Sequence, residues 1–186
     1  MSSRRAKRPI TSTAKSEPRL RVQLKRLTDG SAALSCTRAD GSVIWQRQSG
    51  SRGLVFPAHD LTHFAVESVL GYANGFYGLL AAGWEFGDFA APWPRGPIPA
   101  EAREVELLVG LFEVERRMGG RWTAAQLPEQ AKLYAAAQKP GREVMVRRLA
   151  DDEVARVEAV LQDLLERWSA TRPGETLELE FVAASR

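Results

Sequence analysis

Alternating hydrophobicity at the start of the chain is the strongest constraint on what it can fold into. Apolar and polar residues alternate over residues 19–47, and Asp-Gly pairs at 29–30 and 40–41 divide this stretch into three short runs. A period of two is typical of a strand with one buried face, and Asp-Gly is a strong signal for a tight hairpin turn. The stretch therefore predicts a three-stranded antiparallel meander.

A fourth alternating run lies at the other end of the chain, over residues 176–182. Its two glutamates, Glu178 and Glu180, face the same side of the predicted strand, as Arg21 and Lys25 do on the first one. Opposite charges on neighbouring strands stabilise a sheet. We therefore expect the last strand to lie beside the first in one antiparallel or mixed sheet.

The middle of the chain has the periodicity of helices. Val105, Leu108, Val109 and Phe112, for example, follow the i, i+3, i+4, i+7 spacing of an amphipathic helix. Glycine, proline and capping residues set the expected boundaries. The expected helices cover residues 57–70, 76–83, 101–118, part of 123–138 and 151–171, with loops at 48–53 and 84–99 and an ambiguous segment, either strand or loop, at 143–148.

These elements predict an α+β fold, with a single domain over residues 19–183 in which the helical middle packs on the sheet. Pro57 and Pro128 suit the first turns of their helices, and Asp151 can cap the last helix. Trp45 is expected on the core face of the third strand. A chain of 186 residues is long enough to bury one sizeable core.

The first 18 residues are expected to form a disordered basic tail. Residues 1–26 contain nine Lys/Arg and one acidic residue, whereas the whole chain is +3, so the remainder carries a net charge of −5. No aromatic residue lies among the charges of the tail to stack on bases. Nucleic-acid binding is therefore expected to be limited to a weak contact by the tail.

Cys36 is the only cysteine, so no internal disulfide can form, and its place on an apolar strand face predicts a buried side chain. A single cysteine fits a reducing compartment. No apolar run reaches the ~18 residues of a membrane helix, and the charged N-terminus lacks the features of a signal peptide. We therefore expect a cytoplasmic protein without a membrane partner, of undetermined oligomeric state.

The only two histidines, His59 and His63, lie four residues apart in the predicted helix 57–70. Together with Asp60 and Glu67 they occupy a stripe about 100° wide, and the remaining arc of the helix is mostly apolar. An ordinary surface helix would show a broad polar face. The narrow stripe consists almost wholly of residue types that bind metals.

Two imidazoles at positions i and i+4 can bind one divalent cation from the same face of a helix. Glu67 follows one turn later, either as a third ligand or as a hydrogen-bond partner that orients His63. Two histidines and a carboxylate leave a position open for water, which is typical of catalytic zinc sites. The stripe therefore predicts a zinc-like divalent-metal site with His59, His63 and Glu67 as ligands.

Two further acids, Glu85 and Asp88, lie among aromatic residues at the start of the 84–99 loop. An aromatic environment can raise the pKa of a carboxylate and suit it to general acid–base catalysis. Glu85 is the first candidate for an additional ligand or base, because a chain reversal at residues 74–75 could return it toward His59. Asp60 is the alternative base. The structural alternative is that Glu85 and Asp88 hold loop turns.

The segment HDLTH over residues 59–63, with Glu67 and the glycine-rich segment at 75–84, resembles a group of small uncharacterised bacterial proteins that share an HDLxHxxxE motif. The resemblance covers the chain from about residue 19 onward. It implies a shared fold and a shared site, but it brings no known activity.

The His-Asp-x-x-His core also resembles the zinc motif of ubiquinone-biosynthesis (Coq4-like) proteins. There a carboxylate ligand follows the second histidine by about a dozen residues, a place held here by Gly75, and likeness at the level of fold alone does not transfer a function. In the zincin motif His-Glu-x-x-His the general base is glutamate, which is one methylene longer than Asp60. Peptidase activity is therefore not carried over.

Two functions remain open from the sequence. The first is a metal-dependent hydrolase that acts on an unidentified small-molecule substrate with metal-bound water as the nucleophile. The second is a non-catalytic interaction or structural protein, in which the His/Glu row is a buried hydrogen-bond cluster or a structural metal site. A solvent-connected cavity at His59 and His63 would favour the first, and a closed site would favour the second.

Overall fold

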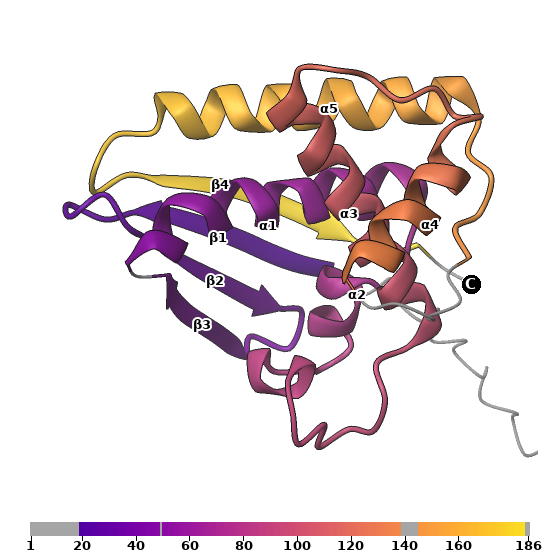
Figure 1. Ribbon diagram of the computed structural model, residues 1–186. Helices are drawn as coiled ribbons and strands as arrows, with labels where there is room; N and C mark the ends of the chain where they lie inside the picture. The colour runs from indigo at the N-terminus through magenta and orange to yellow at the C-terminus, as the bar shows by residue number, and fades with distance from the viewer. Residues whose placement is uncertain (1–18, 49, 139–144, 185–186) are drawn as a thin grey trace, which may run out of the picture.

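The computed structural model describes residues 19–48, 50–138 and 145–184 of the chain, so the expected tail, residues 1–18, lies outside the described part. The described residues form one α+β domain (Figure 1). Its elements in chain order are β1 (Arg19–Arg26), β2 (Ala32–Arg38), β3 (Val43–Gln48), α1 (Ser51–Leu70), α2 (Phe76–Ala81), the 3-10 turn η1 (Phe86–Phe89), α3 (Ala100–Met118), α4 (Leu127–Gln138), α5 (Asp151–Ala170) and β4 (Thr176–Val182).

The sheet has the strand order β3-β2-β1-β4, and all neighbouring strands are antiparallel. The last strand therefore lies beside the first, as expected from the sequence. Glu180 lies opposite Arg21 in the register but forms its ion pair with Arg19, at 2.9 Å. Glu178 accepts a hydrogen bond of 2.7 Å from Gln23. The polar match between the two strands is confirmed, with different partners from the expected ones.

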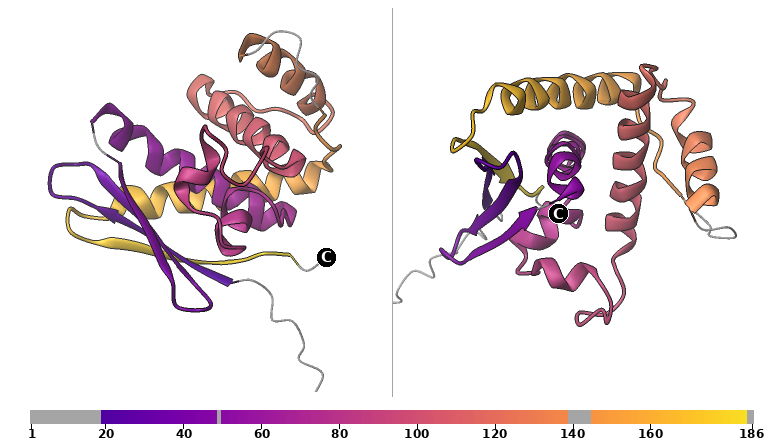
Figure 2. Two further views of the ribbon diagram at one scale, coloured as in Figure 1. Left: turned by 90° about the horizontal axis from the view of Figure 1, so that it is seen from below. Right: turned by 60° about the vertical axis from the view of Figure 1, so that its left-hand side comes forward.

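Helix α1 lies on the buried face of the sheet and is itself enclosed. All eight residues of 60–67 are buried. The right-hand view of Figure 2 looks nearly along α1 and shows the sheet, α5, α3 and α2 arranged around it. A polar side chain in this stretch cannot reach bulk water, so it must find its hydrogen-bond partners within the protein.

Helices α3 and α5 cover α1 with the apolar stripes that the sequence predicts, and α4 packs on α3 with Pro128 in its first turn, as expected. The buried stripe residues are Val105, Leu108, Val109 and Phe112 of α3 and Val154, Val157, Leu161 and Leu164 of α5. None of the helices among the described residues combines the length and apolar character that a membrane span requires.

The start of α1 differs from the expectation. The helix begins at Ser51, so residues 51–53 of the expected loop at 48–53 are helical and Pro57 lies inside the helix. The additional turn packs against the end of β3: a Cβ atom on Gly53 would lie 2.3 Å from the carbonyl oxygen of Gln48. A close approach of two backbones thus fixes this turn, and local sequence signals do not report such tertiary contacts.

Two smaller expectations need correction, and one that was left open can be decided in part. Trp45 is 68% exposed, because Ile44 pairs with the buried Cys36 and neighbouring residues on a strand face opposite sides. Asp151 is the first residue of α5 rather than its cap, and its Oδ1 accepts the N–H of Ala124 at 3.2 Å. Residues 145–148 form no strand, while 143–144 lie outside the described part.

Cys36 is buried as predicted, and burial raises the pKa of its thiol to about 12. The thiol is therefore protonated at neutral pH and acts as a small apolar core group.

The central position of β1 leads to a prediction about stability. Leu24 is buried between Leu34 and Leu177 in the register, so Leu24→Ala should lower the free energy of unfolding by about 2–5 kcal/mol. Lys25→Ala is the matched control, because that side chain is exposed and its loss should change stability by no more than about 0.5 kcal/mol. Urea denaturation measures both. Equal effects of the two substitutions would contradict the central placement of β1.

Candidate metal centre

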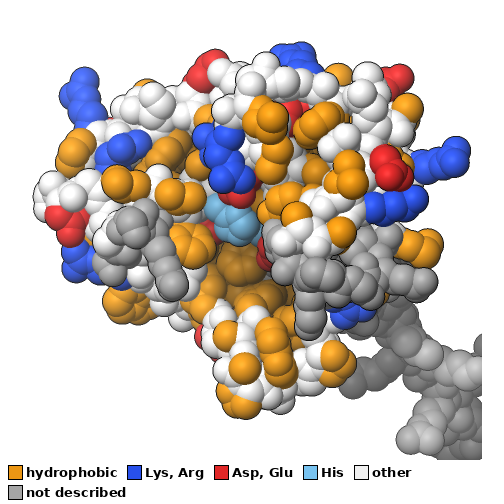
Figure 3. All heavy atoms as spheres, in the orientation of Figure 1, with side chains coloured by type: hydrophobic (Ala, Val, Ile, Leu, Met, Phe, Trp, Pro, Cys, Tyr) orange, Lys and Arg blue, Asp and Glu red, His pale blue; other side chains and the backbone are white. Residues whose placement is uncertain are grey.

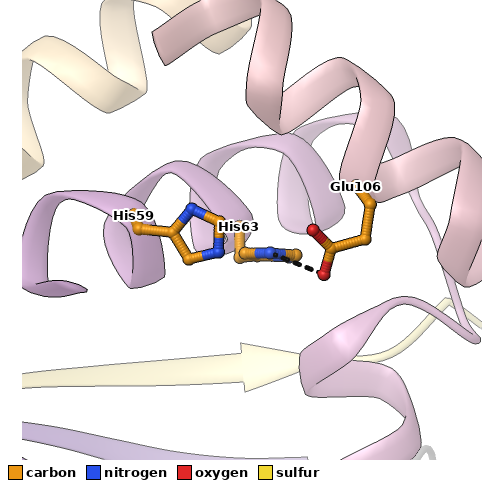
Figure 4. A group of neighbouring side chains, drawn as sticks. All are labelled: His59, His63 and Glu106. Atoms are coloured by element: carbon orange, nitrogen blue, oxygen red, sulfur yellow. Dashed lines mark ion pairs between the residues drawn. The ribbon is translucent and has the colours of Figure 1, made fainter. Parts of the chain in front are cut away.

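His59 and His63 lie one turn apart on α1, with ring centroids 4.8 Å apart, and Glu106 reaches toward them from α3 (Figure 4). One ligand atom from each of the three residues lies within 4.8 Å of the other two. The shortest approach to the carboxylate is 3.4 Å, from Nε2 of His63 to Oε1 of Glu106. In a tetrahedral zinc site the ligand atoms lie about 3–3.5 Å apart, so small side-chain rotations would gather this group around one ion.

Each histidine is held by a further carboxylate through its Nδ1 atom. Nδ1 of His59 lies 3.0 Å from Oε1 of Glu113, and Nδ1 of His63 lies 3.2 Å from Oε1 of Glu67. Such a hydrogen bond fixes the orientation of an imidazole and leaves Nε2 as the metal-binding atom. Glu67 therefore occupies the orienting position, which was one of the two roles expected for it.

The glycine-rich segment after α1 encloses Glu67. The N–H of Gly78 donates a hydrogen bond of 3.2 Å to Oε2 of Glu67. At Gly75 a Cβ atom would lie 2.4 Å from the carboxyl carbon of Glu67, so the chain can close over this carboxylate only where a side chain is missing. Gly75, by its missing side chain, and Gly78, by its backbone N–H, thus both serve the site.

The protonation states of His63, Glu67 and Glu106 depend on one another. Burial alone would lower the pKa of His63, but the hydrogen bonds and charges of Glu106 and Glu67 outweigh burial and raise that pKa to about 10. Burial raises the pKa of Glu67 above its ordinary value, against the opposing effect of His63. For Glu106 burial also acts to raise the pKa, but the interaction with His63 prevails and the pKa is lowered. His63 is therefore an imidazolium between two acids when no metal is bound.

Asp60, expected as an alternative base, faces the sheet. Its side chain is buried and accepts a hydrogen bond of 2.5 Å from Nε2 of Gln48 on β3. Burial raises the pKa of Asp60 to about 6, although Gln48 and the two histidines act in the opposite direction. A side chain in this position supports the packing of α1 on β3 and has no path to a substrate beside His59.

Glu85 and Asp88 hold the loop that follows α2, which is the structural alternative considered above. Glu85 forms an ion pair of 3.1 Å with Arg38 on β2. Asp88 accepts the N–H of Glu85 at 2.8 Å and binds Nε of Arg95 at 2.7 Å. The structure does not bring Glu85 to the histidines as a ligand or base.

A cavity of about 750 Å³ opens beside the group, and two of its three members, His59 and Glu106, line it. Figure 3 shows a histidine side chain at the surface of this hollow, bordered by hydrophobic side chains. The side chain of His59 is 28% exposed, whereas that of His63 is only 2% exposed. The group is thus buried on the side of the sheet and open on the side of the cavity.

Sequence reasoning missed Glu106 and Glu113. They lie seven residues apart on α3, about two helical turns, so both border the same edge of its apolar stripe. That spacing is the only signal in the sequence, and charged residues beside an apolar stripe are usually solvated. Their pairing with the histidines depends on how α3 crosses α1, which local patterns do not report.

No family model matches the chain, and neither a curated protein nor a solved structure shows significant similarity to it. The resemblance to small bacterial proteins with the HDLxHxxxE motif stays a prediction, and the site is interpreted from its geometry alone.

Two substitutions separate a ligand from an orienting residue. Glu106→Gln should abolish stoichiometric zinc binding, whereas Glu67→Gln should weaken zinc binding about 10–100-fold, the usual effect of losing the carboxylate behind a ligand histidine. Glu85→Gln is the control and should leave the affinity unchanged. Competition with a chromophoric chelator measures all three. Loss of binding in Glu67→Gln with normal binding in Glu106→Gln would reverse the two assignments.

Metal affinity should also depend on pH. Because the raised pKa of His63 keeps its imidazole protonated near neutrality, zinc must displace one proton from it. The apparent affinity should therefore rise by about tenfold per unit between about pH 6 and about pH 8. Calorimetry in buffers of different ionisation enthalpy should show the released proton. An affinity that is constant over this range would contradict binding of zinc to a protonated His63.

Proposed function

We propose that this protein is a metal-dependent hydrolase in which His59, His63 and Glu106 bind one zinc ion. The observation that carries the proposal is the joint position of these three donors beside a cavity large enough for a small substrate. Two histidines and a glutamate form a known catalytic zinc ligand set, which leaves one position for water. A zinc ion there would lower the pKa of that water and polarise a substrate carbonyl.

Glu113 is the residue of this chain best placed to accept a proton. It lines the cavity and binds His59 through Oε1. Burial acts to raise its pKa, but the hydrogen bond of His59 prevails and the pKa is lowered, so this carboxylate is ionised at neutral pH. Glu104, another acid of the cavity wall, forms its hydrogen bonds with Tyr72 and Arg147 rather than with a histidine of the site.

The proposed reaction is the hydrolysis of an ester or amide. The oxygen of water bonds to the carbonyl carbon, and one proton of that water passes to Glu113. The bond from carbon to the alcohol oxygen or amine nitrogen then breaks, and Glu113 returns the proton to the leaving group. The products are a carboxylic acid and an alcohol or amine, and no oxidant or reductant is required.

A second candidate is a non-catalytic protein in which these residues form a charged cluster without a metal. The observation in its favour is that both ring nitrogens of His63 already have carboxylate partners, at 3.2 Å and 3.4 Å. The open cavity favours the hydrolase, because a closed structural cluster has no need of contact with solvent.

His59→Ala is the most informative variant. His63→Ala would leave the buried Glu67 without its partner and disturb the fold under either proposal. His59 is partly exposed, so its removal should leave the melting temperature close to that of the wild type while zinc binding and ester hydrolysis are lost. Metal content is measured by mass spectrometry on protein purified without a histidine tag, and hydrolysis with p-nitrophenyl acetate.

Zinc, manganese and iron(II) are offered separately, because two histidines and a carboxylate are also a ligand set of non-haem iron. Higher activity with iron(II) than with zinc would show that iron is the metal of the site. Wild-type protein that takes up no divalent cation at micromolar concentration would rule out the metal-dependent hydrolase and support the metal-free charged cluster. Equal hydrolysis by the wild type and His59→Ala would show that the site is not catalytic.

A further inference from the structure

Part of the cavity wall comes from the loop between α2 and α3. Phe89, Trp93 and Ile98 of this loop line the cavity. Arginine side chains anchor the start of this loop: Arg38 donates to the carbonyl oxygens of Leu80 at the end of α2 and of Trp84, at 2.7 Å and 2.6 Å, and Arg95 donates to that of Gly83 at 2.7 Å. Because Arg95 itself belongs to the loop, its bond to Gly83 ties the part of the loop near Trp93 to the end of α2.

An aromatic series connects this wall with the candidate metal centre. The ring of His63 lies 5.3 Å from that of Phe76, and Phe76 lies 5.1 Å from Phe89. Phe76 and Phe89 both line the cavity. A planar apolar group stacked on Phe89 would therefore lie close to Phe76, the ring that neighbours His63.

Trp93 lines the cavity from a turn in which its N–H donates to the carbonyl oxygen of Ala90 at 3.0 Å and its carbonyl oxygen accepts the N–H of Gly96 at 2.8 Å. Among the described residues it is the only non-glycine with a positive φ, 59°, and its side chain is 45% exposed. A left-handed backbone and an exposed indole both cost free energy, and strain of this kind gathers at ligand-binding sites. A ligand that covers the indole would recover part of that cost.

We propose that the site takes esters or amides of carboxylic acids that carry an aromatic ring, with the ring stacked between Trp93 and Phe89 and the scissile carbonyl at His59, His63 and Glu106. This inference rests on the proposed hydrolase function. Phe89, Trp93 and Ile98 give the cavity wall an apolar part, and Arg103, which also lines the cavity, donates to the carbonyl oxygen of Ile98 there. Offset or edge-on stacking on two aromatic rings selects a flat group over an alkyl chain of similar volume.

Hydroxamates test the substrate class, because the hydroxamate group binds zinc whatever its substituent. Phenylacetohydroxamate should bind the zinc-loaded protein at least about tenfold more tightly than acetohydroxamate, since burial of the ring adds more than 1.4 kcal/mol. Trp93→Ala should remove most of this difference and leave the affinity for acetohydroxamate unchanged. Trp45→Ala is the matched control, because it also removes an exposed indole but on the outer face of the sheet.

A second measurement follows the reaction itself. Phenylacetate and acetate esters with the same leaving group should differ in KM, with the aryl ester lower, and Trp93→Ala should raise only the KM of the aryl ester. Zinc content is determined first in every sample. Absence of zinc in the wild type would overturn the hydrolase and this inference with it. Zinc-loaded protein that binds both hydroxamates equally, or a Trp93→Ala variant that keeps the preference, would overturn the substrate class alone.

Discussion

The buried interaction between His63 and Glu67 is the constraint on which the rest of the site depends. Both side chains lie in the stretch of α1 that is enclosed by the sheet and by other helices. An imidazole and a carboxylate are costly to bury separately, and together they are tolerated only with complete hydrogen bonding. The close approach of residues 75–78 and the reach of Glu106 from α3 satisfy this requirement.

The two histidines differ in their surroundings although they are neighbours on one helix. His63 is fixed on the core side between two acids, and His59 stands at the cavity, held from one side by Glu113. A metal would thus join a rigid ligand to a more accessible one. The division resembles the general arrangement of catalytic sites, in which a packed interior orients groups that face an open pocket.

Most of the fold and part of the candidate site could be predicted from the sequence. Period-two alternation and Asp-Gly turns predict the sheet, since both are local signals, and the charges on the first and last strands indicate their pairing. The histidines were found because i, i+4 spacing is also local. Glu106 and Glu113 were not found, because their partners lie 43 and 54 residues away and depend on the crossing of two helices. Trp45 was placed on the wrong face because β3 is short and all three residues at its start are apolar.

The order of the strands has a consequence for how the chain folds during synthesis. Arg19 and Glu180, which pair across β1 and β4, are 161 residues apart. Until β4 has been made, β1 has one open edge, and an unpaired edge in a nascent chain can associate with other chains. Sheet closure across so long a separation is also slow, because the entropy of a large loop must be lost first. Folding in the cell would then proceed in two stages, with the hairpins of β1–β3 formed early and the sheet completed only after β4 has emerged from the ribosome.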